Sequence, residues 1–226
     1  MPNPRKKVAG SVPVPFFHGA SPTMRRAVLL LGPTGSGKTP LGETIRRRGL
    51  WGAKCLHFDF GENLREVVAR DRPDDLIGRE DIEFLRGVLQ TGALLEDEHF
   101  PVARRVLRRF MATEGADRQT LILLNGLPRH VGQARAIDAI LDVHALIYLQ
   151  CSTETVIRRI RNNVGGDRTE RVDDDPAAIH NKLAIFRRRT APLVEYYRGR
   201  GATIETLEVT AAMTPEQAWS ELNGRR

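Results

Sequence analysis

The octapeptide GPTGSGKT at residues 32–39 constrains the fold of this chain more than any other feature. It fits the pattern GxxxxGK[ST], follows the apolar run AVLLLG at 27–32 and precedes an amphipathic segment. Glycines let the backbone N–H groups of such a loop turn toward one centre, and the helix that follows adds the positive end of its dipole. The sequence therefore predicts a strand, a phosphate-binding loop (P-loop) and a helix that bind a nucleoside triphosphate. A glycine-rich turn without a ligand is the alternative.

The residues of the loop have distinct predicted tasks. Lys38 would reach the β- and γ-phosphates, and the Thr39 hydroxyl would be a ligand of Mg²⁺. The backbone that surrounds the phosphates would come from Gly32, Gly35, Ser36 and Gly37.

Short apolar runs alternate with longer amphipathic segments along the chain, which is typical of a parallel sheet covered on both faces. The predicted strands lie near 27–32, 54–60, 120–126, 143–150 and 202–209. The predicted helices lie near 39–48, 62–70, 79–90, 97–113, 129–141, 153–161 and 177–199. About 60 residues separate the second and third strands, more than one crossover helix needs, so an inserted helical subdomain is expected. The predicted fold is a three-layer α/β/α P-loop domain with a five-stranded parallel sheet.

Composition limits the organisation of the chain. Its 226 residues suffice for one domain, predicted at 24–226, and residues 1–23 contain five prolines that predict a disordered extension. No apolar run approaches the roughly 20 residues needed to cross a bilayer, so no membrane partner is expected. With only two cysteines, neither a disulfide framework nor a four-cysteine zinc site is possible. We therefore expect a cytoplasmic protein without zinc.

The net charge of +7 raises the question of nucleic-acid binding. Seven basic residues at or beyond the predicted domain edges equal that excess. The RRR runs at 46–48 and 187–189 are interpreted as solvated helix faces, and no basic stripe interleaved with aromatic residues is present. We expect no nucleic-acid partner, and a nucleic-acid-binding ATPase ranks last among the alternatives.

Two further segments carry a family resemblance. NGLPRHVGQA at 125–134 and RTERVDDDP at 168–176, taken with the loop, resemble the nucleoside monophosphate kinases and adenylate kinase in particular. FGENLR at 60–65 and LRGVLQTGALLEDEHF at 85–100 are similar to the monophosphate-binding insert of that family. The resemblance covers about Val28 to Val209. It implies a monophosphate-binding insert at 59–95 and a short lid without zinc at 162–176.

The resemblance implies roles for side chains outside the loop. Arg65 and Arg129 would hold the acceptor monophosphate, beside Gly61 and Gly126, because guanidinium groups bind phosphate oxygens bidentately. Gln133 would contact the edge of the acceptor base.

The same resemblance places other residues around the donor and in the lid. Arg159 would stack on the donor base, and Asn125 would contact the Mg²⁺ ion through water. Arg171 would clamp the transferred phosphoryl group, with Arg168 and Lys182 near it. Asp173 and Asp174 would order the lid, whose closure excludes water.

Each of these side chains also has a structural interpretation. Arg65, Arg129 and Gln133 could be surface residues of helices or turns. Arg159 belongs to the arginine-rich run RRIR, and Arg171 could form a salt bridge within the lid.

Four positions depart from the family pattern. Asn125 replaces an aspartate, Asn163 replaces a lid arginine, Lys182 replaces a second arginine, and Phe60 replaces a threonine near the base. We predict a monomeric enzyme that transfers the γ-phosphoryl group of Mg·ATP to a nucleoside monophosphate, with AMP favoured by Gln133. The departures keep two alternatives open: a catalytically weak module that binds adenine nucleotides, or a kinase for another small acceptor.

Overall fold

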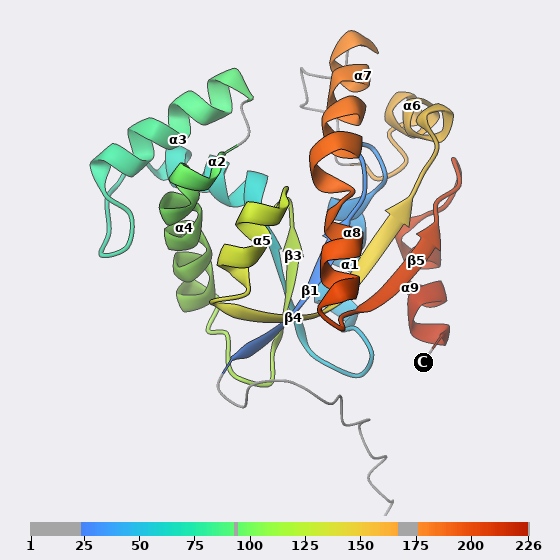
Figure 1. Cartoon of the computed structure of the whole chain (residues 1–226), viewed down its shortest axis with the longest axis horizontal. Helices are drawn as coiled ribbons and strands as arrows, with labels where there is room; N and C mark the ends of the chain where they lie inside the picture. Colours follow the sequence, from blue (N-terminus) through green and yellow to red (C-terminus); the bar gives the residue numbers. More distant parts are fainter. Residues whose placement is uncertain (1–23, 93–94, 167–175, 226) are drawn as a thin grey trace, which may run out of the picture.

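A five-stranded parallel sheet forms the centre of the molecule (Figure 1). The computed structural model describes residues 24–92, 95–166 and 176–225. The strands are β1 (Arg25–Leu31), β2 (Cys55–Asp59), β3 (Leu121–Asn125), β4 (Leu141–Gln150) and β5 (Thr203–Glu208), in the order β2-β3-β1-β4-β5. All neighbouring strands run parallel. All five lie where the apolar runs predict them.

Helices cover both faces of this sheet (Figure 1). Successive residues of a strand point to opposite faces, so Val28 and Leu30 pack on one side while Leu29 and Leu31 pack on the other. The first side carries α1 (Lys38–Arg48) and α9 (Pro215–Gly224). The second carries α2 (Phe60–Arg70), α3 (Arg79–Thr91), α4 (Phe100–Thr113), α5 (Val131–Ile137) and α8 (Leu193–Gly199). This arrangement confirms the predicted α/β fold.

A smaller apolar cluster joins the two remaining helices, α6 (Thr153–Asn162) and α7 (Pro176–Ile185). Val156 and Ile160 of α6 pack there against Ile179 and Leu183 of α7.

Two helix predictions need correction, and one helix was missed. The helix expected at 177–199 is divided by a π-helical turn (Phe186–Thr190). The next helix begins at Leu193, directly after Pro192, which lacks an N–H group. The helix expected at 129–141 ends at Ile137, because β4 begins at Leu141 beside Arg25 of β1. The C-terminal helix α9 was not predicted. The segment between β2 and β3 contains α2, α3, a 3₁₀ turn (Asp97–His99) and α4.

Hydrogen bonds from two tryptophans join α9 to the end of α1. The indole nitrogen of Trp219 donates to the carbonyl of Gly49 at 2.8 Å, and that of Trp51 donates to the carbonyl of Leu222 at 3.2 Å. The Arg48 guanidinium lies 4.8 Å from the centre of the Trp219 ring. The C-terminal helix is thereby joined to the helix that follows the phosphate loop.

The register of the sheet brings three strand ends together. Asn125 at the end of β3 pairs with Asp59 of β2 on one side and with Leu30 of β1 on the other. In parallel sheets, ligands bind at the carboxyl ends of strands where the strand order reverses.

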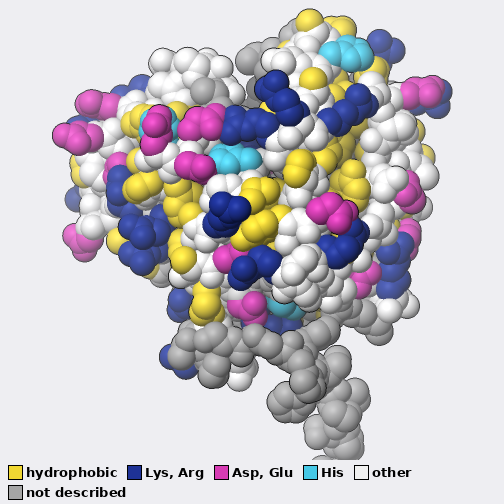
Figure 2. Space-filling view, in the orientation of Figure 1, with side chains coloured by type: hydrophobic (Ala, Val, Ile, Leu, Met, Phe, Trp, Pro, Cys, Tyr) yellow, Lys and Arg dark blue, Asp and Glu magenta, His cyan; other side chains and the backbone are white. Residues whose placement is uncertain are grey.

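The surface is charged and mixed in sign. On the face shown in Figure 2, basic and acidic side chains are interspersed with hydrophobic and uncharged groups. Within the described ranges, no helix is both long enough and apolar enough to span a membrane.

Candidate active site

A cavity of about 430 Å³ opens at the carboxyl ends of β1, β2 and β3. Most of the predicted site residues that the structure describes line it: Gly32, Gly35, Gly37, Lys38, Thr39, Gly61, Arg65, Asn125, Gly126, Arg129, Gln133, Arg159 and Lys182. Residues from the phosphate loop, from α2, from the turn after β3 and from α6 and α7 therefore meet in one space.

The phosphate loop has the backbone geometry that its glycines permit. Gly35 and Gly37 have φ angles of 73° and 93°, a left-handed conformation that other residues rarely adopt. The ammonium group of Lys38 donates to the carbonyl oxygens of Gly32 at 2.7 Å and Pro33 at 2.8 Å. Ser36 is buried beneath the loop, where its hydroxyl donates to Pro33. The N-cap residue of α1, Gly37, has no side chain, and the positive end of the helix dipole lies at the phosphate loop.

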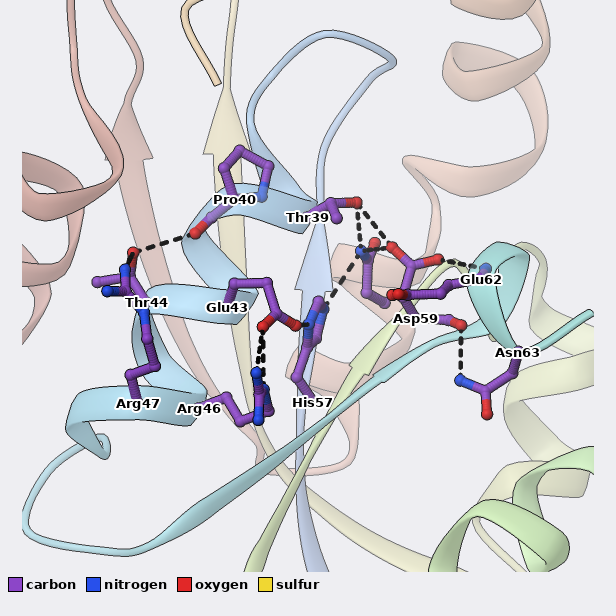
Figure 3. Close-up of polar contacts among 11 residues, drawn as sticks. Thr39, Pro40, Glu43, Thr44, Arg46, Arg47, His57, Asp59, Glu62 and Asn63 are labelled. Carbon is purple, nitrogen blue, oxygen red and sulfur yellow. Dashed lines mark hydrogen bonds and ion pairs between the residues drawn. The ribbon is translucent and has the colours of Figure 1, made fainter. Parts of the chain in front are cut away.

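A hydrogen-bonded group of three side chains lies where α1 meets the strand ends. The Thr39 hydroxyl donates to Asp59 Oδ2 at 2.7 Å, an interaction drawn in Figure 3. The amide nitrogen of Asn125 donates to the same oxygen at 2.7 Å and lies 3.1 Å from the Thr39 hydroxyl. The other carboxylate oxygen accepts the backbone N–H of Glu62 and caps α2.

A second layer supports this group from within the sheet. The His57 side chain is fully buried, and its Nδ1 lies 2.8 Å from the Glu43 carboxylate (Figure 3). That hydrogen bond is the largest cause that lowers the pKa of Glu43, to about 2. The other ring nitrogen of His57 lies 3.5 Å from the Asn125 amide nitrogen. The ring thus lies between α1 and the end of β3.

Magnesium suits the donors of this region. In the described part of the chain, no group of three or more His, Cys, Asp or Glu side chains could form a metal cage. Mg²⁺ usually keeps several waters and binds through one or two protein oxygens plus substrate phosphates. The Thr39 hydroxyl and the Asp59 carboxylate, both at the cavity wall, supply oxygens of that kind.

Arg65, Arg129 and Gln133 reach the cavity from α2, the turn after β3 and α5. The Arg129 side chain donates through Nε to the carbonyl of Gly126 at 3.0 Å. Gln133 is only 2% exposed; its amide oxygen accepts the backbone N–H of Arg129, and its nitrogen donates to the Leu95 carbonyl, both at 2.8 Å. These bonds fix the orientation of the Gln133 amide.

Arg159 is a structural link as well as a wall of the cavity. It is only 5% exposed and donates to the carbonyl oxygens of Gly35, Thr210 and Met213. The phosphate loop is thereby tied to the segment between β5 and α9. Stacking of Arg159 on a base remains a prediction.

The structure gives a local reason for Asn163. This residue ends α6 with a φ of 44°, and asparagine tolerates that left-handed conformation better than arginine does. Arg168, Arg171, Asp173 and Asp174 lie outside the described residues, and their lid roles remain predictions.

Sequence reasoning assigned no role to Asp59, which lines the cavity beside Phe60, one of the four departures from the family pattern. Phe60 is part of the apolar core, with its ring centre 6.1 Å from that of Phe58. Asp59 could have been noticed as a carboxylate at the carboxyl end of a predicted strand. Its relation to Asn125 depends on the strand order, which the sequence does not show directly.

Comparison with known proteins agrees with this geometry. The family model described as Adenylate kinase matches residues 30–202. A protein of Synechococcus sp. (strain CC9311) named "Adenylate kinase" is 32% identical over 184 residues, covering 79% of this chain and 87% of the relative. Two further relatives have the same name. The protein of Methylorubrum extorquens (strain PA1) is 31% identical over 77% of this chain and 84% of the relative. The protein of Bartonella tribocorum (strain CIP 105476 / IBS 506) is 29% identical over 77% of this chain and 87% of the relative. The chain belongs to the adenylate kinase family of nucleoside monophosphate kinases.

Proposed function

We propose that this protein transfers the γ-phosphoryl group of Mg·ATP to AMP and forms two molecules of ADP. The main support is that Lys38 and Thr39 of the phosphate loop line the same cavity as Arg65 and Arg129. Phosphoryl transfer between two polyanions depends mainly on positioning and on neutralising charge. Cationic side chains from both sides of one cavity meet that requirement.

Lys38 and Arg129 would act on the transferred group. Both donate to backbone carbonyl oxygens in the structure, and phosphate oxygens can replace those acceptors. Mg²⁺ bound with ATP would neutralise negative charge on the β- and γ-phosphates. Arg65, exposed on α2, would hold the acceptor phosphate.

Gln133 supports the choice of AMP as acceptor. Among the described residues, its amide bonds to Arg129 and Leu95, which leaves a hydrogen and a lone pair for the edge of a base. A fixed amide that both donates and accepts can distinguish adenine from bases with a different pattern. We further propose that 59–95 is the monophosphate-binding insert and that 162–176 is the lid, with Lys182 at its base.

One observation favours a second candidate, a kinase for another small acceptor. Phe60 lines the cavity where the family has a threonine near the base. A buried phenylalanine offers no hydrogen bond to an acceptor base.

The test is ADP formation from Mg·ATP with AMP, CMP, UMP, GMP or dTMP supplied singly, beside a reaction without acceptor. We expect turnover with AMP that falls by about 10²–10³ in Lys38→Ala, since a charged transition-state contact is lost. Lys54→Ala, which removes an exposed lysine away from the cavity, is the matched control. Turnover with another acceptor alone would establish the second candidate. Rates equal to the no-acceptor rate throughout would refute both.

A further inference from the structure

Asp59 occupies a position from which it can act on the metal that accompanies ATP. Its carboxylate ends β2, lines the cavity and accepts the hydroxyl of Thr39, the side chain that the phosphate loop offers to Mg²⁺. We propose that Asp59 supplies the carboxylate of the magnesium site and thereby replaces the charge that Asn125 lacks. This inference rests on the proposed use of Mg·ATP.

The β2–β3 register makes the replacement geometrically possible. Asp59 and Asn125 are partners in the parallel ladder, and 2.7 Å separates the Asp59 oxygen from the Asn125 nitrogen. A carboxylate on either strand therefore lies at the same edge of the sheet and within reach of Thr39.

The amide of Asn125 matches a carboxylate at position 59, because an amide can donate a hydrogen bond that a carboxylate accepts. Two carboxylates at this separation would repel each other. An asparagine instead donates a hydrogen bond to the Asp59 carboxylate. The pair therefore has one carboxylate, which lies on β2 and not on β3, where the family has its aspartate.

The surroundings also orient the Asn125 amide. His57 Nδ1 lies 2.8 Å from the Glu43 carboxylate, so Nε2 is the ring nitrogen that faces Asn125. The Asp59 carboxylate lies 2.7 Å from the same amide, and an ionised carboxylate only accepts hydrogen bonds. It therefore favours the amide nitrogen on this side, which fixes the hydrogen bond to Asp59.

Capping of α2 does not by itself account for an aspartate here. One carboxylate oxygen accepts the Glu62 N–H, but serine, threonine and asparagine cap helices about as well. The second oxygen faces Thr39 and Asn125 and has no part in the cap. Asp59→Ser therefore separates the two roles, because it keeps a cap and removes the charge.

The experiment measures metal and nucleotide binding without turnover. Mn²⁺ is titrated into the ATP complex and followed by electron paramagnetic resonance, and ATP binding in EDTA is measured by calorimetry. We expect Asp59→Ser and Asp59→Asn to weaken Mn²⁺ binding about 10- to 100-fold. ATP binding in EDTA should stay equal or become tighter, because a negative charge near the phosphates has been removed. The double variant D59N/N125D, which moves the carboxylate to β3, should recover most of the Mn²⁺ affinity.

Three outcomes would overturn the inference: Mn²⁺ affinity of Asp59→Ser equal to wild type, equal loss of ATP binding with and without metal, or no recovery in D59N/N125D. The result is separable from that of the acceptor panel. If wild-type protein forms no ADP while Mn²⁺ binding still depends on Asp59, the proposed transfer fails and the metal assignment stands.

Discussion

The two halves of the cavity are held together by different kinds of contact. The donor half comprises the phosphate loop with Thr39, Asp59 and Asn125, and short hydrogen bonds join these side chains to one another at the ends of buried strands. The acceptor half comprises Arg65, Arg129 and Gln133, and α2 and α3 form its outer wall.

Ion pairs connect that outer wall to α4. Arg109 of α4 is 7% exposed and contacts Asp74 at 2.9 Å and Glu66 at 3.2 Å, while Arg105 pairs with Asp81 of α3. The donor half therefore depends on strand register, whereas the acceptor half depends on charged contacts between helices. The two halves should respond separately to substitution.

Among the variants that distinguish the two halves, Arg129→Ala, at their boundary, should have the largest effect. Loss of a charge-assisted hydrogen bond to phosphate, worth roughly 1.5–3 kcal/mol, should lower kcat/KM for AMP about 10- to 100-fold. The affinity for ATP should change much less. Steady-state kinetics checks this prediction, with the exposed Arg118→Ala as control. An equal loss of affinity for ATP and for AMP would contradict the division of the cavity into a donor half and an acceptor half.

Arg109→Ala should damage the acceptor half selectively. Its removal takes an ion-pair partner from Glu66 and one of two from Asp74, which still has Arg70 at 3.4 Å. The side chains of Asp74 and Glu66 are 26% and 59% exposed, so water offsets part of the loss. We expect the free energy of unfolding to fall by about 2 kcal/mol, below the range for fully buried pairs. KM for AMP should rise while that for ATP stays constant. The control is Arg108→Ala, which removes an exposed arginine of α4, and both variants are studied by urea unfolding and steady-state kinetics. A similar fall in the free energy of unfolding and a similar rise in KM for AMP in Arg108→Ala would contradict a role of the ion pairs.

Gly42→Ala should disturb the donor half through the buried His57 ring, which lies next to Asn125. A Cβ atom at this position of α1 would lie 2.2 Å from the His57 ring nitrogen that faces Asn125. Overpacking of this kind lowers the free energy of unfolding by about 1–3 kcal/mol, and we expect binding of Mg·ATP to weaken with it. Gly87→Ala in α3 has open space around its Cβ and should stabilise the protein by up to about 1 kcal/mol. Equal unfolding midpoints in urea for the two variants would disprove the close approach.

The smallest effect concerns acid stability. The folded-state pKa of Glu43 is lowered from 4.5 to about 2, so its charged form stabilises the fold above pH 4.5. That contribution is lost as the pH falls from about 4.5 toward 2. It should amount to about 1 kcal/mol at most, because Glu43 is partly exposed to water. Urea unfolding between pH 5 and 2.5 should show that the free energy of unfolding depends less steeply on pH in Glu43→Gln than in wild type. Parallel pH dependences for the two proteins would refute this contribution of Glu43.

Local signals explain what could be predicted from the sequence. Each strand is an apolar run of its own, and the phosphate loop is continuous, so both are visible without knowledge of the fold. Helix α9 also has local signals, Pro215 at its start and a capping box between Thr214 and Gln217, which could have revealed it. The position of Asp59 beside Asn125 could not be found in this way. It follows from the placement of β2 beside β3, and crossover topology decides that placement.

The tryptophan contacts between α1 and α9 have a practical consequence. Both tryptophans of the chain are at this junction, and Arg159 connects the adjoining β5–α9 segment to the phosphate loop. Intrinsic fluorescence is therefore an unlabelled optical probe placed on the donor side of the molecule. The insert of α2 and α3 contains no tryptophan, so its movement would require an added fluorophore.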